Sequence, residues 1–144
     1  MKKNARTFWW FIAIAILILI IFALFPVFFP IMRNEAAVKQ YIERLIPLNT
    51  SWDKAHEIIK SNEKWSIIEE HTDVSIVKGK DSNQVRLSNK NDEKNPDVIK
   101  LGNGILIVYL GEYNLPLNTV VEANLVFSEG SLSYISVEKI IDSI

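Results

Sequence analysis

The feature that most constrains this chain is a stretch of twenty-five residues, from Phe8 to Met32, that contains no charged side chain. Its first eighteen residues, as far as Phe25, are all apolar. A bilayer core of roughly 30 Å is crossed by about 20 apolar residues in a helix, and helix is the structure that pairs every backbone group within one segment. The sequence therefore predicts a transmembrane helix over residues 8–32, with the lipid bilayer as one partner and with Trp9 and Trp10 at an interface.

The basic tail at residues 1–7 contains Lys2, Lys3 and Arg6, so a cleaved signal peptide is the alternative interpretation. Cleavable apolar regions are about 7–15 residues long and end in a small-residue site. The longer run here favours an uncleaved signal-anchor and a single-pass protein of the cell membrane. Lys and Arg counts near the two ends of the run are equal, and the denser basic tail favours a cytoplasmic N-terminus with the following domain outside.

Residues 34–144 differ sharply in character, with twelve Lys and Arg against seventeen Asp and Glu, a net charge of −5. The chain has no cysteine, which excludes disulfides and thiolate metal ligands. An acidic domain is also the opposite of what a nucleic-acid partner requires. We expect one small domain over residues 33–144.

Two helices are predicted at the start of this domain. Val38, Tyr41, Ile42 and Leu45 recur at helical spacing. A second helix is expected over Thr50–Asn62, with Thr50 as its N-cap and an acid three residues later.

Strand patterns follow the helices. The polar triplet at 71–73 separates two β-branched runs and indicates a hairpin, Gly102-Asn103-Gly104 indicates a turn, and residues 111–116 indicate a strand connection. The predicted strands are residues 65–70, 74–78, 105–110, 119–127 and 132–138. Between them, residues 79–97 are mostly polar and are predicted to form a mobile loop.

The predicted fold class is therefore α+β: one N-terminal transmembrane helix, followed by two helices packed on one face of an antiparallel sheet of three to five strands.

The sequence contains few residues suited to catalysis. His56 and His71 lack the spacing of a metal motif, although His71 lies among Glu69, Glu70 and Asp73, which could bind a cation. We predict no catalytic residue, no cofactor and no metal site. Residues 111–116 are a candidate partner-facing loop, because loops that join rigid strands often carry function. Its candidate binding residues are Glu112, Tyr113, Asn114 and Leu115.

The capped helix at Thr50–Asn62, the strand Ile105–Gly111 and the hairpin formed by Val120–Phe127 and Leu132–Glu138 together resemble the SmpA/OmlA-like domains, which are small bacterial envelope proteins of the outer-membrane assembly machinery. The resemblance covers roughly the last two thirds of the chain and includes no specific motif. It implies a fold that recognises other proteins without catalysis, and it assigns no site residues.

The leading hypothesis is a membrane-anchored, non-catalytic domain that binds a protein partner in the bacterial cell envelope. An alternative is a membrane-held immunity protein whose acidic surface neutralises a basic toxin. A third hypothesis, from another class, is a small hydrolase that uses His56 or His71 with nearby carboxylates.

Overall fold

The computed structural model describes residues 3–28, 30–89, 91–114 and 117–141, with the side chains of residues 9–21 described within the first helix. Three helices come first: α1 (Lys3–Phe28), α2 (Glu35–Leu45) and α3 (Trp52–Ser61), with a short 3-10 turn η1 (Pro30–Met32) between α1 and α2. The strands follow in the order β1 (Ser66–Gly79), β2 (Val85–Leu87), β3 (Val98–Asn114), β4 (Asn118–Ser128) and β5 (Ser131–Ile141), with the 3-10 turn η2 (Asp92–Lys94) before β3.

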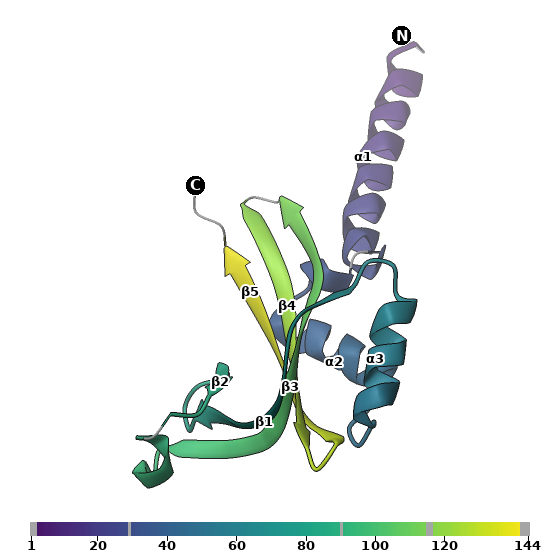
Figure 1. Ribbon diagram of the computed structural model, residues 1–144. Helices are drawn as coiled ribbons and strands as arrows, with labels where there is room; N and C mark the ends of the chain where they lie inside the picture. Colours follow the sequence, from purple (N-terminus) through teal and green to yellow (C-terminus); the bar gives the residue numbers. More distant parts are fainter. Residues whose placement is uncertain (1–2, 29, 90, 115–116, 142–144) are drawn as a thin grey trace.

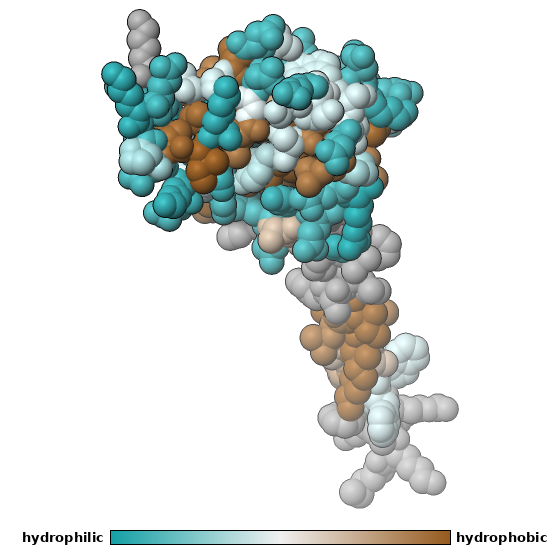
Figure 2. All heavy atoms as spheres, turned by 90° about the horizontal axis from the view of Figure 1, so that it is seen from below, coloured by the Kyte–Doolittle hydropathy of each residue, from teal (hydrophilic) through white to brown (hydrophobic). Residues whose placement is uncertain are grey.

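The prediction of a membrane span is wrong. Over the described residues, no helix combines the length and the apolar character that crossing a bilayer requires. The predicted transmembrane helix, signal-anchor and single-pass membrane protein are thereby contradicted. Among the side chains described in α1, those from Trp9 to Ile21 are apolar and nearly all exposed. Figure 2 shows these apolar side chains on the helix that projects from the rest of the molecule.

The five strands form one antiparallel sheet in the order β2-β1-β3-β4-β5. The sheet curls into a half-barrel, with β2, η2 and the adjoining ends of β1 and β3 extending to one side as a wing (Figure 1). Irregularities in pairing between β1 and β3, and one between β3 and β4, allow this bend, because a bulge increases local twist. The predicted fold class is therefore also wrong about the sheet, which was expected as a simple layer beneath two helices and is instead a curled half-barrel (Figure 1).

Helices α2 and α3 bury their apolar faces on one side of the sheet. Val38 and Ile42 of α2 and Ala55 and Ile59 of α3 are buried there, together with Phe127 of β4. The N-cap of α3 is Ser51, whose hydroxyl accepts a hydrogen bond from the Lys54 amide at 3.4 Å. The Thr50 hydroxyl instead donates to the Pro47 carbonyl, so the predicted cap is displaced by one residue.

Residues 66–79 form one strand instead of the predicted hairpin. The polar triplet does not reverse the chain: Asp73 adopts a φ of 59°, and the pairing with β3 is irregular between Thr72 and Ile76. The seventeen residues of β3 provide a partner along this whole length. A sequence that looks like a turn is therefore accommodated as an irregularity within a long pair of strands.

The predicted turn at Gly102-Asn103-Gly104 is likewise wrong, because these residues lie within β3. A Cβ atom on Gly102 would lie 2.2 Å from the carbonyl oxygen of Phe127. The glycine is therefore required by the close approach of β4, where a side chain would collide with backbone.

The polar segment at residues 79–97, predicted as a mobile loop, contains β2 and η2. Its central contact is an ion pair in which both Arg86 Nη1 and Nη2 lie 2.6 Å from the carboxylate oxygens of Asp92. Asp92 is buried at 8% exposure and also accepts a hydrogen bond from the Asn89 amide at 2.8 Å. This charge-assisted, bidentate pair joins β2 to η2, while Val85 of β2 packs against the apolar cluster around Ile76.

The wing should open in acid. The hydrogen bond from Arg86, followed by that from the Asn89 amide, lowers the pKa of Asp92 from 3.8 to about 2. A lowered carboxyl pKa stabilises the fold fully above the unfolded-state value, and this stabilisation is lost as the pH falls through the folded-state value. We expect the Asn89 amide proton to stay protected from exchange above about pH 4 and to lose protection towards about pH 2.

Exchange of this amide, followed by NMR, checks the expectation. Asp92→Asn should show the unprotected behaviour already at neutral pH, whereas Asp97→Asn in the same segment should resemble the parent chain. Equal protection of the Asn89 amide in Asp92→Asn and the parent would contradict the role of the ion pair.

Candidate functional site

The sheet face opposite α2 and α3 carries a group of polar side chains, and we call this group the acidic face. It is defined by Glu69 of β1, Tyr109 of β3, Glu122 and Asn124 of β4, and Ser136 and Glu138 of β5. Their neighbours in sequence, such as Val108, Ala123 and Val137, belong to the core beneath the helices. Because side chains alternate along a strand, these polar groups are placed together on the other face.

Two carboxylates of the acidic face lie directly opposite one another. Glu122 of β4 pairs in register with Glu138 of β5, and on its other side Glu122 pairs with Tyr109 of β3. Like charges at directly opposed positions of adjacent strands destabilise a sheet. The arrangement thus carries an energetic cost that apolar or oppositely charged residues would have avoided.

The electrostatics of Glu122 reflect this crowding. Burial raises the pKa of Glu122, and the negative charges of Glu138 and Glu69 raise it further. A raised carboxyl pKa means that the folded state is penalised when the group ionises, so this penalty is present at neutral pH and disappears in acid. Burial also raises the pKa of Tyr109, with a smaller contribution from Glu112.

Asn124 and Ser136 form the floor of the acidic face. They pair directly across β4 and β5 and are buried, at 6% and 4% exposure. The Asn124 side-chain amide donates to Glu138 Oε1 at 3.1 Å and lies 3.4 Å from Ser136 Oγ. The hydrogen bond from Asn124 orients the Glu138 carboxylate on the face that also carries Glu122.

Positively charged side chains gather at Tyr134, which lies four positions before Glu138 on the same face of β5. The Lys39 ammonium of α2 lies 4.9 Å from the centre of its ring, and that of Lys78 in β1 lies 5.4 Å from the same centre. Both distances suit cation–π attraction. One strand face therefore carries positive charge beside its first half and negative charge on its second half.

The two histidines do not form a common site. His56 Nε2 lies 3.2 Å from Glu70 Oε2 between α3 and β1, whereas His71 Nε2 lies 3.3 Å from Glu69 Oε2 within β1. Glu69 and Glu70 are adjacent in a strand, so their side chains point to opposite faces. Within the described chain, no three His, Asp or Glu side chains group closely enough to hold a metal ion.

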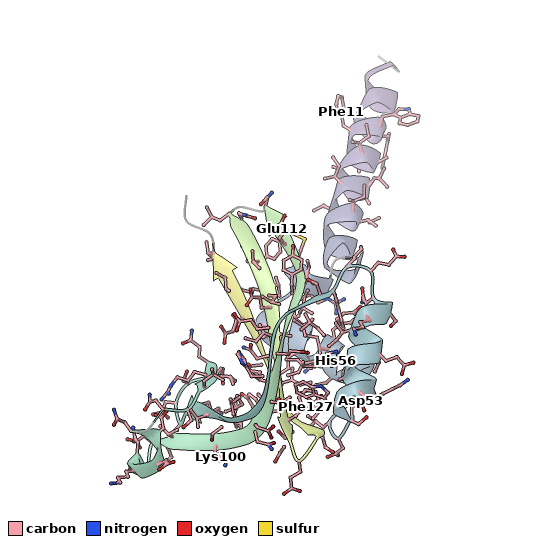
Figure 3. All side chains as sticks on the ribbon, viewed as in Figure 1. Phe11, Asp53, His56, Lys100, Glu112 and Phe127 are labelled. Carbon is pink, nitrogen blue, oxygen red and sulfur yellow. The ribbon has the colours of Figure 1, made fainter. Side chains whose placement is uncertain are left out.

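The predicted partner-facing loop is largely strand. Glu112, Tyr113 and Asn114 are the last residues of β3 and pair with Val120, Thr119 and Asn118, whereas Leu115 lies outside the described residues. In Figure 3, Glu112 lies near the end of the sheet next to α1, far from Phe127.

Within the predicted loop, Glu112 and Asn114 are exposed and Tyr113 is half-buried. The Tyr113 hydroxyl lies 3.1 Å from Lys139 Nζ, which also donates to the Arg33 carbonyl. These contacts make Tyr113 part of the packing between strand ends and the start of α2.

Sequence reasoning did not find the acidic face. Glu122 and Glu138 occupy the outward positions of two alternating strands, which indicates only a solvated face when each strand is considered alone. The short turn at Ser128–Ser131 sets the pairing of β4 with β5 only for the residues directly beside it. Counting outward from that turn would have placed Glu122 opposite Val137, because the irregularity between Val126 and Phe127 shifts the register by one residue and so brings Glu138 opposite Glu122.

Comparisons of the chain with protein-family models, with curated proteins and with solved structures found no match. The resemblance to the SmpA/OmlA-like domains therefore stays a prediction.

Proposed function

We propose that this chain is a non-catalytic protein-binding domain whose acidic face binds a positively charged segment of a partner protein. The observation that carries the proposal is the directly opposed pair of Glu122 and Glu138. Binding sites commonly retain groups that lower the stability of the free protein. A lysine or arginine of a partner placed between the two carboxylates would relieve their repulsion.

The net charge of the domain also supports a positively charged partner. Residues 34–144 have a net charge of −5, so a basic partner would be attracted before contact as well as after it. Asn124 supports it too, because its side-chain amide orients one of the two carboxylates from a buried position. An oriented carboxylate loses less side-chain entropy on binding than a freely rotating one.

The proposal is tested with a labelled peptide of alternating lysine and serine, whose binding to the full chain is followed by fluorescence polarisation at low and at moderate salt. Replacing both carboxylates, Glu122→Gln with Glu138→Gln, is expected to weaken binding about tenfold or more. The free energy of unfolding should stay the same or rise by about 0.5 kcal/mol, because the like-charge pair is removed.

The matched control is Asp53→Asn with Glu57→Gln, which removes the same two charges from the exposed surface of α3. This control should change the affinity by less than about twofold. If both double variants weaken the peptide equally, the attraction comes from overall charge, and the acidic face is not the site.

A second function, the neutralisation of a basic toxin, is supported by the same acidic face. It differs in its biological consequence: deletion of the chain should sensitise cells to a toxin. Restoration of resistance by the parent chain but not by the Glu122→Gln, Glu138→Gln variant would support it, and unchanged sensitivity on deletion would contradict it.

A further inference from the structure

A separate pocket of about 200 Å³ lies on the helix-covered side of the sheet, at the end where α3 begins. It forms where the start of α3, the irregular part of β1, the middle of β3 and the turn between β4 and β5 meet. Its lining residues are Trp52, Thr72, Asp73, Asn103, Gly104, Phe127 and Gly130.

Aromatic rings form one wall of this pocket. The centres of the Trp52 and Phe127 rings are 4.7 Å apart and their planes are inclined at 64°. Gly104 leaves room for this arrangement, because a Cβ atom there would lie 3.2 Å from Trp52 Cζ3. In Figure 3, Phe127 lies beside His56 and Asp53 of α3, at the same end of the sheet. The indole of Trp52 is therefore held by ring packing and by the absence of a side chain beneath it.

Polar groups form the opposite rim. Asp73, which is exposed and has a left-handed φ of 59°, lines the pocket. Within the described chain, the Asp73 carboxylate has no hydrogen bond and no ion pair. Asn103 Oδ1 accepts a hydrogen bond from the Glu129 amide at 3.2 Å, so Asn103 is fixed in place.

We infer that this pocket binds an organic cation, a guanidinium or alkylammonium group, between the aromatic wall and the Asp73 carboxylate. Tryptophan is the side chain that attracts cations most strongly through its ring face, and a carboxylate supplies the charge-assisted hydrogen bond such a group needs. The Lys54 ammonium of α3 lies 2.6 Å from the Glu57 carboxylate, so it already has an anionic partner.

The inference is independent of the proposed function. Phe127 and Trp52 pack against the core beneath the helices, whereas Glu122 and Glu138 lie on the opposite face. Loss of binding at one surface therefore leaves the other unaffected.

The test uses capped arginine, N-acetyl-arginine amide, added to the full chain while the indole N–H signal of Trp52 is followed by NMR. The signal is identified by its loss in Trp52→Phe. We expect saturable binding with a Kd of about 1–10 mM, and no saturable shift with N-acetyl-citrulline amide, which is similar in shape but uncharged.

Asp73→Asn is the decisive variant, because asparagine also adopts the left-handed conformation and removes only the charge. It should weaken binding of capped arginine about tenfold, whereas Asp53→Asn on the adjoining turn of α3 should change it less than about twofold. Equal affinities in the two variants, equal binding of the citrulline compound, or absence of saturation would each overturn the inference. Tighter binding of free arginine than of capped arginine would identify a free small molecule as the ligand, and the reverse would identify a protein side chain.

Discussion

Replacement of Phe127 by alanine is expected to lower the free energy of unfolding by about 3–5 kcal/mol. The Phe127 side chain is 1% exposed and contacts the Trp52 ring, so truncation leaves a cavity beneath α3 as well as removing apolar contact. Domains of this size are typically stable by about 5–15 kcal/mol, and the variant would lose a large part of that stability.

Urea unfolding of the full chain, followed by circular dichroism, measures this effect. Phe127→Leu retains most of the buried volume and should cost less than about 1.5 kcal/mol. A loss below about 1 kcal/mol for Phe127→Ala would mean that α3 and the β4–β5 turn close over the cavity, contrary to the rigid packing described for Trp52.

Gly102→Ala is expected to destabilise the chain by about 1–3 kcal/mol, although alanine normally improves on glycine in a strand by roughly 0.5–1 kcal/mol. The added Cβ would lie 2.2 Å from the Phe127 carbonyl oxygen and 2.9 Å from Val126 Cγ1. A backbone atom cannot turn away as a side chain can, so β3 and β4 must separate locally.

Gly79→Ala is the matched control. There the nearest atom to an added Cβ is Ser82 Cβ, at 3.3 Å, which belongs to the surface of the wing and can shift. Thermal unfolding of both variants should show a clear loss for Gly102→Ala and a small change for Gly79→Ala. A stability of Gly102→Ala equal to or above that of the parent would contradict the close approach of the strands.

The parts of the fold that local sequence determines were predicted well. The apolar spacing from Val38 to Leu45 identified α2, because periodicity and helix ends are encoded within one turn of the chain. The alternation from Thr119 to Phe127 and from Leu132 to Glu138 identified β4 and β5, since each strand has one buried face.

The failures occurred where distant segments decide the structure. The triplet at 71–73 and the glycines at 102 and 104 have the composition of turns, yet pairing with a neighbouring strand keeps each within a long strand, with Asp73 as a local irregularity. The wing was missed because it depends on contacts made only in the folded chain. These are the ion pair between Arg86 and Asp92 and the packing of Val85 against the apolar cluster around Ile76. Hydropathy of residues 8–32 likewise led to a membrane span that the described residues do not support.

Candidate sites depend even more strongly on long-range pairing. Glu122 and Glu138 are sixteen positions apart in sequence, and Trp52 and Asp73 come from a helix and a strand that meet only in the folded chain. Only the register of β4 with β5, and the packing of α3 on the sheet, places these residues together.

The contact between α2 and β5 has a consequence for the order in which the chain acquires its structure. Lys139 of β5 donates to the carbonyl of Arg33, 106 positions earlier in the chain, and Lys39 of α2 reaches the ring of Tyr134. During synthesis α2 emerges from the ribosome long before β5, so its apolar face has no permanent cover while the intervening strands are made. The first helix of the folded core is therefore among the last to dock, and the interval before docking is when the growing chain is most exposed to aggregation and most dependent on chaperones.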